Sequence, residues 1–410
     1  MKNRMMQGKM LGIILAVALA GLLLLTACGP APAGPAEGKR VVEIGYISPF
    51  TGAGSSQEQI SLSAVLDYVR YFNEEERIPG VTIEVLWGDS ASSLDRFVSI
   101  YERFKARGIA VMISNDTFGI VPRQSRFERD KIPLLSANPV KEIAYPPHWY
   151  YFFRPTWAEQ PAAVADYVME NWQEERPPKL ALIAVDSTYG RQPIPEAIKY
   201  AESLGIEMLP PEFVPYVVLD ATVQLLRLKE GGADFAYISG LIVTAGPILR
   251  DAERLGLLDQ IDFAGVEATS GRRLIELAGA ASEGYLFPKS FPAIGETEVP
   301  GIKLMQDVQM KYHGKVIKEE EYVVGWVEIA VTCEAIRRAA EEVGYENLDG
   351  PAIKEAFDSI KDFDIDGLVT ITYTAEDHRG SDKVAIYQIQ GGKIVRATDW
   401  RAAPSLAPQG

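Results

Sequence analysis

Cysteine, histidine and positive charge are all scarce in this chain. Its 410 residues include two cysteines and three histidines, and 41 lysines and arginines stand against 56 aspartates and glutamates. Two cysteines cannot build a disulfide scaffold or a cysteine-rich zinc site, and His148, His313 and His378 are far apart in the sequence. We therefore expect no metal centre. The formal net charge of -15 argues against nucleic-acid binding, which needs a basic surface.

Motifs of the common enzyme classes are also missing. The sequence has no Gly-x-Ser-x-Gly, no His-Glu-x-x-His, no glycine-rich phosphate loop ending in Lys-Ser/Thr, and no Gly-x-Gly-x-x-Gly after a predicted strand. Asp116 and Glu267 could be imagined as the paired carboxylates of a glycosidase. No other feature supports that chemistry, so we expect neither an enzyme nor a bound cofactor.

The first 27 residues have the form of a secretory signal, in which a basic start precedes an apolar run over 10–27. The run ends in Leu25-Thr26-Ala27-Cys28, which resembles the cleavage box of bacterial lipoproteins. This resemblance implies that residues 1–27 are removed and that Cys28 carries lipid. The alternative is an uncleaved anchor, because the run is about long enough to span a bilayer.

Residues 28–40 are rich in Pro, Gly and Ala, and this composition predicts a flexible tether. Once Cys28 is lipidated, Cys333 has no partner within the chain. It lies in an apolar helical pattern, so we expect a buried and inert thiol.

From residue 41 onward, apolar strand patterns alternate with helical patterns, as in an α/β protein with doubly wound parallel sheets. Roughly 150 residues per domain gives two or three domains. Strands are predicted over 41–47, 81–87, 110–113, 133–136, 180–185, 206–209, 235–238, 261–264, 284–287, 368–373 and 383–390. Helices are predicted over 62–72, 94–107, 159–172, 194–204, 221–230, 244–255, 299–313 and 321–343.

Five segments resemble, in sequence and in their order along the chain, segments of one protein family: Ile44–Gly52, Asp186–Gly190, Ala278–Gly284, Phe363–Leu368 and Tyr387–Ile394. Together they resemble the extracytoplasmic substrate-binding proteins of ABC importers, of the branched-chain amino-acid (Leu/Ile/Val) type. The resemblance implies a type I periplasmic binding fold, with two doubly wound lobes joined by a three-segment hinge.

The expected division of the chain follows from three crossings, placed near Arg154-Pro155, Leu286-Phe287 and Gly380-Ser381. The first lobe is then 41–154 plus 287–380, the second is 155–286 plus 381–403, and 404–410 is a tail.

Ligands of open parallel sheets bind beyond the carboxyl ends of the strands. Thr117 follows the strand over 110–113, where the family uses a small hydroxyl and a helix N-terminus to bind a carboxylate; alternatively, Asp116 or Thr117 only caps the helix. Ser136, Ala137 and Asn138 follow the next strand. The family has a longer Ser-Pro-Gly-Ala-Thr run there, so ordinary amino-acid specificity is in doubt, and Asn138 could instead be a turn residue.

The second lobe supplies three further candidates. Tyr189 could close over a ligand, or could simply be a surface residue at a helix start. Leu241 stands where the family commonly has an aromatic residue, which implies a wider pocket. Glu267 matches the carboxylate that binds the ligand's α-ammonium in amino-acid-binding members; the alternative is a carboxylate that stabilises a helix N-terminus.

Three aromatic residues, Phe50, Phe118 and Phe287, could line the apolar part of the pocket, although most aromatic residues belong to the core.

The resemblance implies a solute-binding component that captures a small solute by hinge closure and delivers it to an ABC permease. A branched-chain or related amino acid is favoured, and an amide or aromatic acid is the alternative. We expect a monomer outside the cytoplasm, lipid-anchored through Cys28 to the outer face of the cell membrane or in the periplasm. A sensor of the same fold remains the second functional hypothesis.

Overall fold

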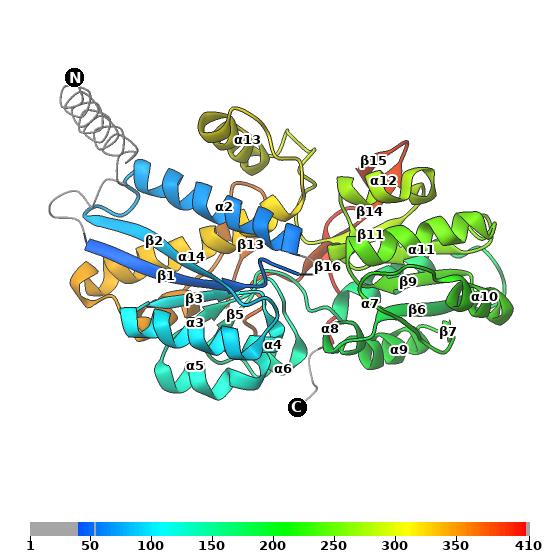
Figure 1. Cartoon of the computed structure of the whole chain (residues 1–410), viewed down its shortest axis with the longest axis horizontal. Coiled ribbons are helices and arrows are strands. Elements are labelled where there is room, and N and C mark those ends of the chain that lie inside the picture. Colours follow the sequence, from blue (N-terminus) through cyan, green and yellow to red (C-terminus); the bar gives the residue numbers. More distant parts are fainter. Residues whose placement is uncertain (1–39, 53–54, 407–410) are drawn as a thin grey trace, which may run out of the picture.

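The computed structural model describes residues 40–52 and 55–406, which form two lobes side by side (Figure 1). The predicted signal segment, the lipidation site Cys28 and most of the tether lie outside the described residues. Within the described part, no helix combines the length and the apolar character needed to cross a bilayer.

The first lobe is built on a parallel sheet of five strands in the order β2-β1-β3-β4-β5. Its strands are β1 (Arg40–Ser48), β2 (Val81–Asp89), β3 (Val111–Ser114), β4 (Leu134–Leu135) and β5 (Tyr150–Tyr151). A small antiparallel ribbon in a later part of the chain consists of β12 (Phe363–Asp364) and β13 (Thr370–Ile371).

Helices cover both faces of this sheet (Figure 1). They are α2 (Ser55–Glu74), α3 (Leu94–Arg107), α4 (Thr117–Ile120), α5 (Gln124–Asp130), α6 (Lys141–Ala144), α13 (Pro300–His313), α14 (Glu321–Val343) and α15 (Gly350–Asp358).

Helix α14 is the buried centre of the first lobe and packs along α2. Trp326 is fully buried and meets Tyr68 of α2 edge to face, with ring centroids 4.8 Å apart. The approach is close because position 325 is a glycine: a Cβ there would lie 2.2 Å from the Ser61 carbonyl oxygen. Cys333 is also buried in this helix, as predicted.

The second lobe is built on a mixed sheet of nine strands, whose main path runs β15-β14-β11-β10-β9-β6-β7. Its strands are β6 (Lys179–Val185), β7 (Glu207–Met208), β8 (Glu212–Val214), β9 (Phe235–Ser239), β10 (Asp262–Gly265), β11 (Leu286–Lys289), β14 (Lys383–Gln390), β15 (Lys393–Arg396) and β16 (Arg401–Ala402). The helices are α7 (Glu159–Asn171), α8 (Thr188–Arg191), α9 (Ile194–Ser203), α10 (Thr222–Gly231), α11 (Ile242–Arg254) and α12 (Arg272–Ala278).

The chain passes between the two sheets three times: after β5, after β11 and before β14. The predicted strand over 284–287 lies instead at 286–289. The predicted division between Leu286 and Phe287 therefore falls inside β11, which pairs with β10 and β14 of the second sheet. The α/β architecture with two sheets and a three-segment connection is the one expected from the sequence.

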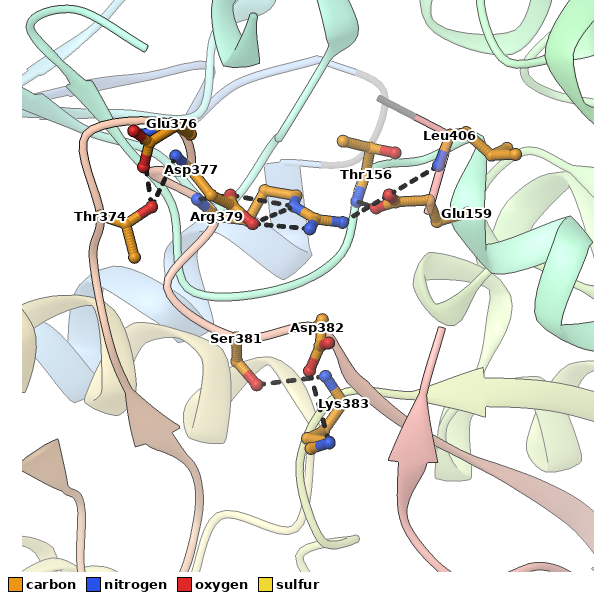
Figure 2. Close-up of polar contacts among 10 residues, drawn as sticks. All are labelled: Thr156, Glu159, Thr374, Glu376, Asp377, Arg379, Ser381, Asp382, Lys383 and Leu406. Atoms are coloured by element: carbon orange, nitrogen blue, oxygen red, sulfur yellow. Dashed lines mark hydrogen bonds and ion pairs between the residues drawn. The ribbon is translucent and has the colours of Figure 1, made fainter. Parts of the chain in front are cut away.

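Two of the connecting segments are held together by a partly buried ion cluster (Figure 2). The Arg379 guanidinium contacts Glu159 at the start of α7, and its Nε and Nη2 donate to Asp377 at 3.0 and 2.6 Å. Glu159 is completely buried and also accepts from the Thr156 amide at 2.7 Å and from the Leu406 amide at 3.3 Å. One carboxylate thus joins the first connection, the third connection and the end of the described chain.

Candidate functional site

A cavity of about 440 Å³ lies between the two lobes, and residues of both lobes line it. Of the eight ligand-binding residues predicted from the sequence, the lining includes Thr117, Phe118, Ala137, Asn138, Tyr189, Leu241 and Glu267. They converge because each follows the carboxyl end of a parallel strand, and these ends face the same gap in both sheets.

The loop after β3 turns directly into α4, and Asp116 caps that helix. Asp116 Oδ1 accepts from the amides of Phe118 and Gly119 at 3.1 and 3.3 Å. The capping role that the sequence left open thus belongs to Asp116, and Thr117 is the first helical residue. The Phe118 ring is 47% exposed on the cleft wall, whereas Phe50 and Phe287 are core residues that do not line the cavity.

Two hydrogen bonds join the loops that follow β3 and β4. Asn115 Oδ1 accepts from the Ala137 amide at 2.7 Å, and Asn138 Nδ2 donates to the Asn115 carbonyl oxygen at 2.5 Å. Ser136 is fully buried and does not line the cavity; its Oγ accepts from the Asn138 amide at 3.1 Å. The contribution of Ser136 is therefore to position Asn138.

Tyr189 stands on the second lobe's wall at the start of α8. The turn is tight because a Cβ at Gly190 would lie 2.2 Å from the Val185 carbonyl oxygen, so only glycine lets α8 begin so close to β6. The Tyr189 hydroxyl donates to the Gly240 carbonyl oxygen at 3.3 Å, and its ring meets Trp157 edge to face, with centroids 5.7 Å apart. Burial raises the pKa of Tyr189, so the ring stays neutral.

Glu267 follows β10 and is already paired within the chain. Its Oε2 lies 3.2 Å from Arg154 Nη1 and accepts from the Ser290 hydroxyl at 2.9 Å, and its Oε1 accepts from the Ser290 amide at 3.2 Å. Arg154 Nε also donates to the Ala137 carbonyl oxygen at 2.7 Å. Arg154 thus connects the first lobe's loop to the second lobe's carboxylate.

A second buried ion pair lies in the same cleft. Lys289 Nζ is 2.9 Å from Glu320 Oε2, and the two side chains are 2% and 9% exposed. Burial opposes the charged form of Lys289, but Glu320 and Glu267 outweigh that effect and raise its pKa. The lysine therefore stays positively charged and bound to Glu320.

Three further carboxylates line the first lobe's side of the cleft: Glu58, Asp116 and Glu321. Burial raises the pKa of all three, that of Glu58 to about 7. Glu321 accepts from Gln57 Nε2 at 2.7 Å. Nearby charges act in both directions on Glu58, since Asp116 raises its pKa and Arg154 lowers it.

Several lining residues escaped the sequence reasoning. Ala91 and Ser92 follow the carboxyl end of β2, as the predicted lining residues follow the ends of other strands. Both have positive φ angles, 48° and 54°. Arg154 and Trp157 reach the cleft from the first connection and Lys289 from the carboxyl end of β11. Glu320 and Glu321 reach it from the start of α14. Clusters of three or more His, Cys, Asp or Glu side chains able to hold a metal ion are absent from the described residues.

Comparisons with known proteins agree with this geometry. The sequence profile of a family described as periplasmic binding protein matches residues 41–393. Leu/Ile/Val-binding protein homolog 1 of Brucella suis is 26% identical over 253 residues, covering 60% of this chain and 66% of that protein. Homolog 2 of Brucella abortus is 22% identical over 248 residues, with the same coverage. The chain thus spans 66% of the length of these curated relatives.

Solved structures match over more of the chain. A branched chain amino acid ABC transporter protein of Thermus thermophilus, with bound valine, is 27% identical and has a TM-score of 0.83, covering 89% of this chain and 97% of that one. A fatty acid ABC transporter substrate-binding protein of Thermomonospora curvata is 18% identical with a TM-score of 0.80, covering 92% and 97%. At 18% identity, the similarity to the Thermomonospora curvata protein shows only that the fold is shared.

Proposed function

Because this chain belongs to the periplasmic binding protein family, we propose that it is the solute-binding component of an ABC importer. Membership and fold agree with the sequence resemblance, and the family implies a location outside the cytoplasm. In the proposed function, the protein captures a small solute between its lobes and presents the closed form to a membrane permease. No part of this cycle requires a catalytic residue.

One observation carries the proposal: the same cavity is lined from both lobes, and three chain segments join them. A solute that contacts both walls stabilises the closed arrangement over the open one, and its differential affinity for the two sets the extent of closure. Thr117, Phe118, Ala137 and Asn138 would contact the solute from the first lobe. Tyr189, Leu241 and Glu267 would contact it from the second.

An amino acid is the first solute class to test, because the Thermus thermophilus protein holds valine. Two features of this chain affect how an amino acid could bind in the cleft. Glu267 is engaged by Arg154, so a ligand ammonium would have to share or displace that partner. The loop over 136–138 is short, and its Asn138 amide group is tied to the neighbouring loop.

The proposal extends to the anchoring of the protein. The lipoprotein-like segment ending in Cys28 supports attachment to the outer face of a membrane, with residues 28–40 as the tether. A monomer suffices for this function, since one chain supplies both walls of the cleft.

The test is calorimetric titration of the mature chain, residues 28–410, after removal of any carried-over solute by unfolding and refolding. The panel contains the twenty amino acids, small amides and aromatic carboxylates, and small-angle scattering follows closure. We expect binding in the micromolar range, about -8 kcal/mol, together with a smaller radius of gyration. Binding without any compaction would contradict the closure mechanism.

A further inference from the structure

The cleft holds more negative than positive charge, and the cations that line it in the described part of the chain are already neutralised. Arg154 is paired with Glu267 and Lys289 with Glu320, and all four side chains are at most 9% exposed. Buried ion pairs of this kind are costly to break because separation leaves an uncompensated charge. Neither Arg154 nor Lys289 is therefore available to receive an anionic ligand.

Glu58, Asp116 and Glu321 line the same cleft without an ion-pair partner among the described residues. Each stands at a helix start: Glu58 in the first turn of α2, Asp116 at the cap of α4 and Glu321 in the first turn of α14. The helix dipoles compensate them in part. The raised pKa values of all three carboxyls are nevertheless the sign expected for buried or half-buried acids that lack a cation in contact.

Asp116 shows most directly that a partner is missing. The residue is 2% exposed and its Oδ1 serves the helix cap, but its Oδ2 has no hydrogen-bond partner among the described residues. Ser90 lies close enough to favour the charged form of Asp116, yet within the described chain the Ser90 hydroxyl forms no hydrogen bond either. A buried carboxylate oxygen without a donor is costly, and a ligand N–H group would remove that cost.

The same cap removes the usual place for a ligand carboxylate. The amides of Phe118 and Gly119 at the start of α4 already donate to Asp116. A carboxylate placed there would compete with Asp116 for those donors and would be repelled by its charge. The start of α4 therefore favours a ligand cation and disfavours a ligand anion.

The rest of the wall suits an organic cation. Tyr189, Tyr216 and Phe118 line the cleft and offer aromatic faces, which attract ammonium and guanidinium groups. The Trp157 Nε1–H group is buried and has no acceptor among the described residues. A neutral carbonyl or hydroxyl oxygen on the ligand would satisfy it.

We propose that the cleft selects a small organic solute of net positive charge, whose ammonium or guanidinium group donates to Asp116 Oδ2 beside Glu58. The inference rests on the proposed function, because it assigns a ligand class to the same cleft. It differs from binding of a zwitterionic amino acid in two respects: Asp116 takes the cation, and no ligand carboxylate is required.

Three compounds with the same alkyl group test this inference on the mature chain. Leucinamide carries an ammonium and a neutral amide, leucine carries the ammonium and a carboxylate, and 4-methylpentanoate carries the carboxylate alone. We expect leucinamide to bind at least about tenfold more tightly than leucine, and 4-methylpentanoate not to bind. The variant Asp116→Asn keeps the helix cap, because asparagine caps as well as aspartate, but removes the charge. It should weaken leucinamide binding by about tenfold or more.

The matched control is Asp349→Asn, the same change at the cap of α15, where the Asp349 carboxylate accepts from the Ala352 amide at 2.9 Å outside the cleft. It should leave all three affinities unchanged. Equal or tighter binding of leucine, or binding of 4-methylpentanoate, overturns the inference but leaves the proposed function intact. If none of the three compounds binds, the inference of a cationic ligand is also overturned. The proposed function is then tested separately, by whether any other compound of the wider panel binds and closes the lobes.

Discussion

Arg154 Nη1 and Glu267 Oε2 lie 3.2 Å apart, and the two side chains are only 6% and 5% exposed. Arg154 belongs to the first connection between the sheets, whereas Glu267 follows β10 of the second sheet. The guanidinium also holds the loop after β4 through the Ala137 carbonyl oxygen. One side chain therefore fixes the relative position of a hinge segment, a first-lobe loop and a second-lobe carboxylate.

Replacing Glu267 by glutamine should destabilise the folded protein, because the buried Arg154 charge loses its counter-ion. We expect the free energy of unfolding to fall by about 3 kcal/mol, measured by urea denaturation of the ligand-free chain. The matched control is Glu170→Gln, which breaks the pair between Arg401 and Glu170, with side chains 30% and 53% exposed. That change should cost at most about 1 kcal/mol. Equal losses in the two variants would contradict a structural role for the buried pair.

Glu58 should make stability depend on pH. Its pKa is raised from 4.5 to about 7, first by burial, with Asp116 adding repulsion and Arg154, Ser48 and Asn115 opposing the shift. Between these values the folded protein holds a proton that the unfolded chain releases, so the free energy of unfolding falls as pH rises from about 4.5 to about 7.

The variant Glu58→Gln lacks this fall. Relative to wild type, we expect it to gain on the order of 2 kcal/mol of stability across that pH interval, measured by denaturant titration at several pH values. A difference between the two proteins that stays constant from pH 4 to pH 8 would show that Glu58 titrates normally.

Gly325 should be indispensable to the packing of α14 on α2. A methyl group there would lie 2.2 Å from the Ser61 carbonyl oxygen, which belongs to backbone and cannot rotate away. We expect Gly325→Ala to cost about 3 kcal/mol or more in thermal or urea denaturation, despite the better helix propensity of alanine. Gly295 is the control, since a Cβ added there would meet no described atom within 4 Å; Gly295→Ala should be close to neutral. Similar stabilities of the two variants would rule out the steric argument.

Tyr189 should contribute to solute affinity mainly through its ring. Removal of the ring in Tyr189→Ala takes away apolar area and the edge-to-face contact with Trp157, and we expect affinity to drop about tenfold to a hundredfold. Tyr189→Phe keeps the ring and loses only the 3.3 Å hydrogen bond to Gly240, so its affinity should change by less than about fivefold. Calorimetry with whichever solute is found to bind distinguishes the two, and an equal loss in both variants would assign the effect to the hydroxyl.

Long periodic elements were readable from the sequence, whereas only some of the short ones were: the two-residue strands β4 and β7 were predicted, but others were not. The helix predicted over 321–343 has those bounds in the structure, because its apolar residues recur at helical spacing over a long segment that is mostly buried. Strands β5 and β8 contain two and three residues, too few to show a period, and they were missed. The strand β11 was predicted two residues too early. Its apolar Leu286 and Phe287 are followed by Pro288 and Lys289, which are residue types typical of a loop, although Lys289 is buried in the strand.

The residues of the candidate site also fall into those that could be predicted from the sequence and those that could not. Residues such as Thr117, Tyr189 and Glu267 could be predicted because they follow recognisable strands. Arg154 could not, since its place in the cleft depends on how the first connection folds back between the lobes. Lys289 could not, because it ends β11, which was predicted two residues too early. Nor could the sequence reveal that Glu267 has a cation of its own, because Arg154 is 113 positions away.

The packing of α14 on α2 has a consequence for how the chain acquires its structure after synthesis. The Tyr322 hydroxyl donates to Asp67 at 2.7 Å across 255 positions of sequence, and the whole second sheet up to β11 lies between them. A ribosome releases α2 long before α14, so the apolar face of α2 has no partner helix while β6 to β11 of the second sheet are being made. Contacts this distant slow folding and leave intermediates open to aggregation. The lobe that begins the chain therefore stays incomplete until α14 has been made, and the need to protect the apolar face of α2 until then follows from topology alone.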